Sequence, residues 1–135
     1  MQSLKLLLDT HTLLWAIGKT RELAKTVIAE IKNPDNEILV SAVSLWEIAL
    51  KHGIEKLKVN FDIKNIPEYC RKMDFELIPL EPLDALNSAR LSPKSDHKDP
   101  FDRMLIYQCI KNKYTLVSKD TRMALHKEDG LTFLW

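Results

Sequence analysis

Residues 6–15 read LLLDTHTLLW, and the fold is decided by this stretch. Residues 5–8 are typical of a short buried strand, and residues 12–18 of a helix that follows almost at once. Asp9 separates the two apolar runs. An acid at such a junction can cap the helix, because its carboxylate accepts backbone N–H bonds from the first turn. Whether Asp9 does more than cap depends on the other acids of the chain.

Length and composition predict one globular domain spanning residues 1–135. A chain of 135 residues can bury a proper core, and 45% hydrophobic with 29% charged residues excludes a disordered or fibrous protein. The 20 basic and 19 acidic side chains nearly cancel, so any nucleic-acid contact must come from a local basic patch.

Several absences in the sequence predict a cytoplasmic protein without membrane contact. Every apolar run is well short of the roughly 20 residues that span a membrane, and nothing at the start resembles a signal peptide. Cys70 and Cys109 have neither disulfide-framework nor metal-finger spacing, so we expect reduced thiols.

Strand-like and helix-like segments alternate along the chain. The expected strands are residues 5–8, 37–40, 75–79, 114–117 and 131–134. The expected helices are residues 12–18, 21–32, 41–52, 68–73, 82–91, 100–112 and 121–126, and residues 55–67 read as a loop. Short apolar strands separated by helices predict an α/β fold, with a parallel sheet covered on both faces. In such sheets, sites form beyond the carboxyl ends of the strands.

Periodicity also predicts which side of two helices faces the core. The inner face of helix 21–32 is expected to carry Leu23, Val27, Ile28 and Ile31. The inner face of helix 82–91 is expected to carry Leu83, Leu86 and Ala89.

Glu47 stands on a helix that is apolar nearly all round, with Val43 and Leu50 at helical spacing from it. An unpaired buried carboxylate costs several kcal/mol, so the site must supply a cation or raise the pKa of the acid. The alternative is an ordinary pair with Lys51, four residues on.

Asp99 and Asp102 open the helix at residues 100–112. Asp99 followed by Pro100 is a good helix start, and an acid at position 102 suits the helix dipole. Asp102 also shares its face with Leu105 and Ile106, which predicts that it points inward.

Asp120 follows the strand at residues 114–117 as Asp9 follows the first strand, and it too could be a cap. Acids gathered at one end of a parallel sheet repel one another and need a shared counter-charge. Carboxylates without His or Cys spacing favour Mg²⁺ or Mn²⁺ over zinc. Such a site is suited to metal-assisted phosphodiester cleavage.

Four segments together resemble a known family. LLLDTHTLLW, SAVSLWEIALK, DPFDRMLIYQC and LVSKD resemble the PIN-domain ribonucleases, specifically the VapC-like toxins of type II toxin–antitoxin systems. The closing TFLW also resembles the last strand of that subfamily. The resemblance implies a three-layer α/β/α fold with a mostly parallel sheet of about five strands. It further implies a metal-dependent endoribonuclease with an RNA substrate, a small cognate antitoxin and a homodimeric state.

The resemblance also assigns the acids. It implies that Asp9, Glu47, Asp102 and Asp120 are catalytic. Mg²⁺ or Mn²⁺ would be held chiefly by Asp9 and Asp102, with Glu47 and Asp120 bound directly or through water. Asp99 is a candidate fifth acid; if it were the ligand, Asp102 would serve only the helix dipole.

Three polar residues next to the acids are further candidates. Thr10 and Ser118 could hydrogen-bond a ligating carboxylate or a water, although ordinary turn chemistry also explains them. His11 suits the subfamily, and its alternative interpretation is a capping or core histidine.

A basic rim could hold RNA around the acidic centre. Its candidate members are Lys51, Arg103, Lys119 and Arg122. A solvated charged surface is the alternative explanation.

Other functions fit the sequence less well. A haloacid dehalogenase-type phosphatase needs a second acid two residues after Asp9, where His11 stands, and a receiver domain needs an adjacent acidic pair that is missing. A catalytically inactive PIN-like module that binds RNA or a protein partner stays open. The presence of all four acids favours an active nuclease.

Overall fold

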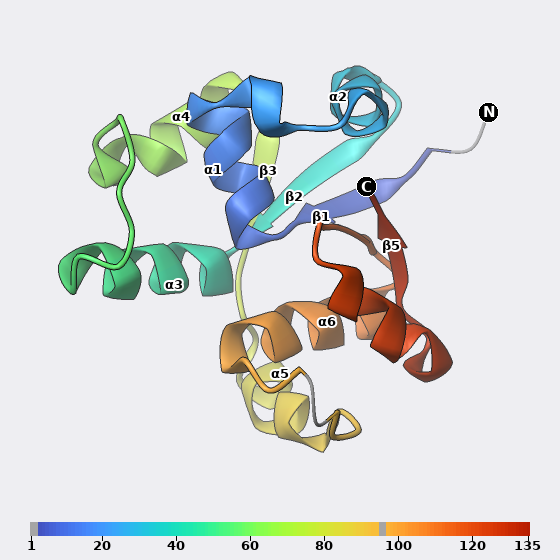
Figure 1. Ribbon diagram of the computed structural model, residues 1–135. Coiled ribbons are helices and arrows are strands. Elements are labelled where there is room, and N and C mark those ends of the chain that lie inside the picture. Colours follow the sequence, from blue (N-terminus) through green and yellow to red (C-terminus); the bar gives the residue numbers. More distant parts are fainter. Residues whose placement is uncertain (1–2, 95–96) are drawn as a thin grey trace.

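A parallel sheet organises the chain. Figure 1 shows the computed structural model, which describes residues 3–94 and 97–135. The described strands form a five-stranded sheet in the order β3-β2-β1-β4-β5, with every neighbouring pair parallel. The strands are β1 (Lys5–Leu8), β2 (Glu37–Ser41), β3 (Phe75–Ile78), β4 (Thr115–Val117) and β5 (Thr132–Leu134). The predicted α/β class and parallel sheet are confirmed.

Helices cover both faces of this sheet (Figure 1). The α-helices are α1 (Thr10–Gly18), α2 (Lys25–Lys32), α3 (Ala42–Gly53), α4 (Ile66–Lys72), α5 (Pro82–Asn87) and α6 (Pro100–Asn112). The 3₁₀ segments are Thr20–Glu22, Ile63–Asn65, Ser88–Arg90 and Thr121–Asp129. Helices α1, α2 and α4 lie on one face, and α6 with the 3₁₀ helix Thr121–Asp129 lies on the other. None of the described helices is long and apolar enough to cross a membrane.

The continuous LLL of β1 is explained by this layering. Leu6 and Leu8 are fully buried in the core beneath α1, α2 and α4, whereas Leu7 is fully buried in the core beneath α6. Successive strand residues face opposite sides, so a strand covered on both faces needs apolar side chains at every position. The two free cysteines are buried, Cys70 in the first core and Cys109 in the second.

Among the predicted segments whose bounds differ from the structure are helix 21–32 and loop 55–67. Helix 21–32 is divided, because Leu23 and Ala24 are extended between the 3₁₀ turn Thr20–Glu22 and α2. The expected loop 55–67 ends earlier than predicted, since Ile63–Asn65 is a 3₁₀ turn and α4 begins at Ile66. Apolar side chains of residues 55–67, among them Leu57 and Phe61, pack against the first core.

The predicted inner face of helix 82–91 is wrong. Leu83 and Leu86 are 65% and 72% exposed, whereas Asp84 is buried and forms an ion pair with Lys111 of α6. Ser88 is also buried, and its hydroxyl donates to the carbonyl of Ala85. The helix turns its polar side to α6 because Lys111 supplies a partner for the carboxylate.

Helix α3 is also less enclosed than its sequence predicts. Val43 and Ile48 are buried, but Trp46, Leu50 and Ile54 are 52%, 45% and 63% exposed. Trp46 packs edge-on against Phe101 of α6, with ring centroids 5.1 Å apart. The apolar outer side of α3 is therefore surface.

The strand order places a crevice at the centre of the sheet. The chain builds β2 and β3 on one side of β1, then β4 and β5 on the other side. Helices leaving adjacent strands to opposite sides open a crevice at the carboxyl ends of β1 and β4. The backbone N–H of Asp9 donates to the Val117 carbonyl across this junction, at 3.1 Å.

Candidate active site

Five carboxylates share a cavity of about 390 Å³ at the carboxyl end of the sheet. They are Asp9, Glu47, Asp99, Asp102 and Asp120. Asp9 follows β1, Glu47 lies on α3, Asp99 and Asp102 open α6, and Asp120 follows β4. The structure thus brings together every acid that the sequence singled out.

Asp9 caps α1 and lines the cavity. Its Oδ1 accepts the backbone N–H of Thr12 at 2.8 Å, so the predicted capping role is confirmed. Burial raises the pKa of Asp9, although hydrogen bonds from Ser118 and Thr12 oppose that rise. The ionised form is therefore disfavoured when no cation is nearby.

Glu47 is only 4% exposed and has two partners. Thr10 Oγ1 donates to Oε1 at 2.5 Å, and Lys51 forms an ion pair with Oε2. The pair with Lys51, one of the two interpretations of the sequence, is present. It does not remove Glu47 from the site, because Glu47 and Lys51 both line the cavity.

Asp99 and Asp102 both reach the cavity. Asp99 Oδ1 accepts the backbone N–H of Asp102 at 2.9 Å, which confirms it as the cap of α6. The pKa of Asp102 is raised, chiefly by burial and further by the charges of Asp99 and Glu47, whereas a hydrogen bond with His97 lowers it. On the same helix, Leu105 is buried as predicted.

Asp120 is paired with Arg122. Its Oδ2 lies 2.6 Å from Arg122 Nη2, and its Oδ1 accepts the backbone N–H of Arg122 at 2.9 Å. The Arg122 guanidinium lowers the pKa of Asp120 despite partial burial. Ser118 Oγ accepts the backbone N–H of Asp120 at 3.1 Å, so the expected turn chemistry of Ser118 is present.

His11 is an exposed residue at the rim of the cavity. Its ring centroid lies 5.8 Å from that of Trp15, which also lines the cavity. Asp9, not His11, caps α1. The interpretation of His11 as a capping or core histidine is therefore wrong.

Three of the four candidate RNA-binding residues line the cavity: Lys51, Lys119 and Arg122. Lys119 Nζ lies 5.8 Å from the ring of Trp15. Arg103 lies elsewhere, since its guanidinium donates to the backbone carbonyls of Leu91 and Ser92.

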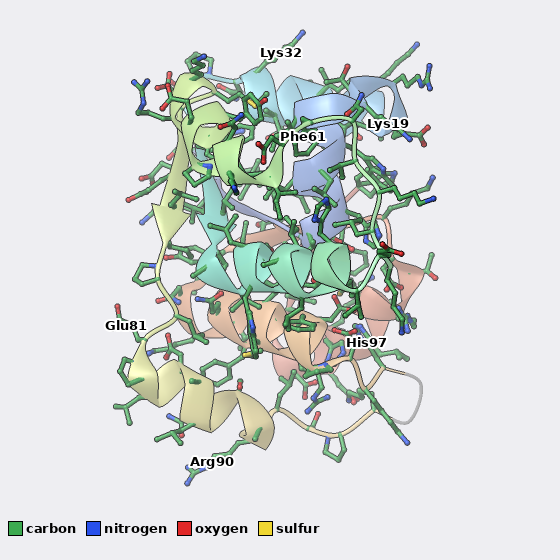
Figure 2. The ribbon with its side chains drawn as sticks, turned by 90° about the vertical axis from the view of Figure 1, so that its left-hand side faces the viewer. Lys19, Lys32, Phe61, Glu81, Arg90 and His97 are labelled. Atoms are coloured by element: carbon green, nitrogen blue, oxygen red, sulfur yellow. The ribbon has the colours of Figure 1, made fainter. Side chains whose placement is uncertain are left out.

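The sequence interpretation missed two buried histidines next to the acids. His97 Nε2 lies 3.0 Å from Asp102 Oδ2, and His97 Nδ1 lies 2.9 Å from His126 Nε2. Figure 2 shows His97 beside the amino-terminal end of α6. A histidine two residues before Asp99, with Lys98 between them, is the signal in the sequence, but a contact with residue 126 could not be read from it.

The donor set of the cavity suits a divalent cation. Five carboxylates face three basic side chains, and burial disfavours ionisation of Asp9 and Asp102. Ligand atoms of His97, Asp102 and Asp120 lie within 4.8 Å of one another. A divalent cation among these oxygens would stabilise the ionised acids, and carboxylate oxygens are the donors that hard cations prefer.

Comparison with known proteins identifies the family of this chain. Residues 6–128 match the PIN domain family model. The chain belongs to the PIN-domain family. It is 26% identical to Ribonuclease VapC22 of Mycobacterium tuberculosis over 133 residues, which are 96% of this chain and 97% of that protein. The resemblance noted in the sequence is confirmed.

Solved structures share the fold of this PIN domain. VapBC2 from Rickettsia felis, bound to a DNA fragment from its promoter, superposes with a TM-score of 0.68 and 18% identity, covering 97% of this chain and 98% of that one. VapBC-1 from nontypeable Haemophilus influenzae gives a TM-score of 0.65 and 11% identity, covering 97% of each chain. The three-layer PIN-like architecture is thereby confirmed.

Proposed function

We propose that this PIN domain is a metal-dependent endoribonuclease and the toxin of a toxin–antitoxin pair. The observation that carries the proposal is the convergence of five carboxylates from separate elements on one cavity with basic side chains at its rim. The 26% identity to a ribonuclease, VapC22, supports the same reaction class.

The acids divide into two groups in this proposal. Asp9 and Asp102 are the principal ligands of Mg²⁺ or Mn²⁺, and Glu47 and Asp120 complete the site directly or through water. When bound by these acids, the cation would supply an activated water and neutralise charge on the phosphate and the leaving oxygen. Asp99 caps α6 and adds negative charge beside Asp102.

The remaining residues of the cavity orient the acids and the RNA. Thr10 fixes Glu47 by donating to its Oε1. Lys51, Lys119 and Arg122 border the acids and contact the phosphates that flank the scissile bond. Cleavage adds water across one phosphodiester, which leaves a phosphate on one fragment and a hydroxyl on the other.

The test is cleavage of total RNA by the purified protein with Mg²⁺, Mn²⁺ or EDTA, with Asp102→Asn beside the wild type. We expect cleavage with either ion, none with EDTA, and a loss of about 100-fold or more in the variant. Equal cleavage with EDTA and with metal would contradict the metal-dependent reaction.

A catalytically inactive PIN-like module is the second candidate. It predicts RNA binding without cleavage under every metal condition. The retention of all four acids around one cavity favours the active enzyme.

We also propose that a small antitoxin protein binds this chain and blocks the acidic cavity. The support is that the structural neighbours were solved as VapBC assemblies. Co-expression with a short reading frame adjacent to the gene should yield a stable complex that no longer cleaves RNA. If the chain stays unbound and still cleaves RNA when the product of that reading frame is present, this part of the proposal is wrong.

A homodimer is the third part of the proposal. Two helices that both pack against α6 carry exposed apolar side chains: Trp46 and Leu50 on α3, with Ile54 directly after it, and Leu83 and Leu86 on α5. Two-fold dimers are the commonest homo-oligomers, and they bury such surfaces against themselves. Light scattering should give twice the chain mass for the wild type and the chain mass for Leu50→Glu. A monomeric wild type would contradict the dimer.

A further inference from the structure

The feature that the proposed reaction leaves unexplained is the buried histidine pair behind Asp102. His97 and His126 are both fully buried, and they come from the segment before α6 and from the 3₁₀ helix Thr121–Asp129. A short chain of contacts runs from Asp102 Oδ2 to His97 Nε2 at 3.0 Å, and from His97 Nδ1 to His126 Nε2 at 2.9 Å.

When Asp102 is ionised, hydrogen-bond chemistry determines which ring nitrogens of His97 and His126 carry a proton. A carboxylate only accepts, so His97 Nε2 carries the proton and donates to Asp102. In neutral His97 the other nitrogen, Nδ1, then accepts from His126 Nε2–H. His126 Nδ1 is left as an acceptor, and within the described part of the chain it has no hydrogen-bond partner.

Asp129 agrees with this assignment. Its Oδ2 lies 3.6 Å from His126 Nδ1 and is likewise without a hydrogen-bond partner among the described residues. Two acceptors that face each other cannot form a hydrogen bond. One set of tautomers therefore accounts for both contacts and for both unpartnered atoms.

The same contacts argue against His97 as a direct ligand of a cation. A histidine ligand needs a free ring nitrogen, and both nitrogens of His97 are already in hydrogen bonds. The Nε2–H of His97 instead donates to Oδ2 of Asp102, so that Oδ1 of Asp102 stays free to bind a cation in the cavity. A neutral donor can fix a carboxylate without neutralising its charge, unlike the guanidinium of Arg122 on Asp120.

We propose that His97, held in orientation by His126, is a positioning residue that fixes the Asp102 carboxylate for binding a divalent cation. This inference rests on the proposed metal-dependent function. Removing a residue that orients a metal ligand in this way typically lowers metal affinity about 10–100-fold.

Two substitutions at one position separate this role from simple packing. The amide nitrogen of glutamine can take the position of Nε2, so His97→Gln can keep the donor to Asp102. Asparagine is shorter and reaches only the position of Nδ1, so His97→Asn loses that donor. Both variants remove the imidazole ring and replace it with a smaller amide.

Metal affinity is the primary measurement, with Mn²⁺ titrated into each protein and followed by electron paramagnetic resonance. We expect His97→Asn to raise the Mn²⁺ dissociation constant about tenfold or more and His97→Gln to change it less than about threefold. Thermal unfolding in EDTA should give similar midpoints for the two variants. Equal weakening by both, or none by either, would overturn the proposal.

The direct-ligand alternative has its own signature. Nitrogen hyperfine coupling to bound Mn²⁺ in the wild type, lost in both variants, would identify His97 as a ligand and overturn the positioning role. If both variants fail to fold, His126→Gln and His126→Asn give the equivalent test one residue further from the metal. There, His126→Gln can keep the donor to His97, and only His126→Asn should weaken Mn²⁺ binding.

Asp102→Asn separates this proposal from the proposed function. If Asp102→Asn leaves Mn²⁺ binding unchanged, the metal site itself is wrong. If Asp102→Asn abolishes binding while His97→Asn does not weaken it, only the positioning role fails.

Discussion

At the scale of single residues, Asp9 combines a structural and a chemical role on one carboxylate. It caps α1 and lines the cavity, while burial raises its pKa. Asp9→Asn should therefore lower metal-dependent cleavage about 100-fold or more. In EDTA the unfolding free energy should be unchanged or slightly higher, because the variant removes one of several repelling charges. Cleavage assays and urea unfolding check both parts, and wild-type cleavage by the variant would contradict the assignment.

His126 predicts a pH dependence of stability. Burial lowers its pKa, and the charges of His97 and Arg103 act in the same direction, whereas Asp129 opposes them. Below pH 6.5 the unfolded chain binds a proton that the folded protein resists, so stability falls as the pH drops toward the lowered pKa. The slope from this one group is at most about 1.4 kcal/mol per pH unit.

The measurement is urea unfolding in EDTA between pH 7.5 and 5.5, a range of roughly two units that brackets the ordinary histidine pKa. We expect His126→Gln to show a shallower acid loss than the wild type, since glutamine does not titrate. Parallel curves for the two proteins would mean that His126 takes up its proton equally in the folded and unfolded states.

The sequence predicts residues that act through chain position better than residues that act through distant contacts. Asp9, Asp99 and Asp120 were identified because each stands at an element boundary, and each caps a helix in the structure. His97 was missed because its partner His126 lies 29 positions away. A pair at that separation has no periodicity that a reader of the sequence could detect.

At the scale of elements, α3 couples Glu47 to Lys51 over one helical turn. Glu47→Gln should lower cleavage about 100-fold, as loss of a site acid would. Lys51→Ala should still fold but lose about 3 kcal/mol, more than an exposed pair would cost, because the substitution leaves the buried Glu47 carboxylate without its ion partner. For Lys51→Ala we expect a several-fold rise in KM for RNA and a smaller change in kcat. If Lys51→Ala unfolds the protein while Glu47→Gln stays active, the pair is structural and Glu47 is not part of the site.

The strands were predictable and two helix faces were not. A strand buried on both sides has to be apolar throughout, which makes β1 and β2 evident in the sequence. The apolar residues of α3 and α5 have helical spacing too, but Leu50 and Leu86 point to solvent. Periodicity reports that a helix has an apolar side and does not report what covers that side. The buried Asp84 of α5 depends on Lys111 of α6, which again is a tertiary partner.

At the scale of the whole molecule, one sheet separates two cores. Leu6 and Leu8 of β1 pack in the core under α1, and Leu7 packs in the core under α6. Unfolding of either helical layer would expose one face of the same buried strands. The site spans the same division, because Asp9 opens α1 on one face and Asp102 belongs to α6 on the other.

This shared sheet predicts one cooperative unfolding transition for the two layers. Leu105→Ala, in the core under α6, should cost about 2–5 kcal/mol. In a Trp46→Phe background, fluorescence comes from Trp15 and Trp135, which pack against the opposite core. The fluorescence midpoint in urea should therefore fall as far as the midpoint from far-ultraviolet circular dichroism. If only the dichroism midpoint moves, the layers unfold separately, and the site loses its acids from α6 before those from α1.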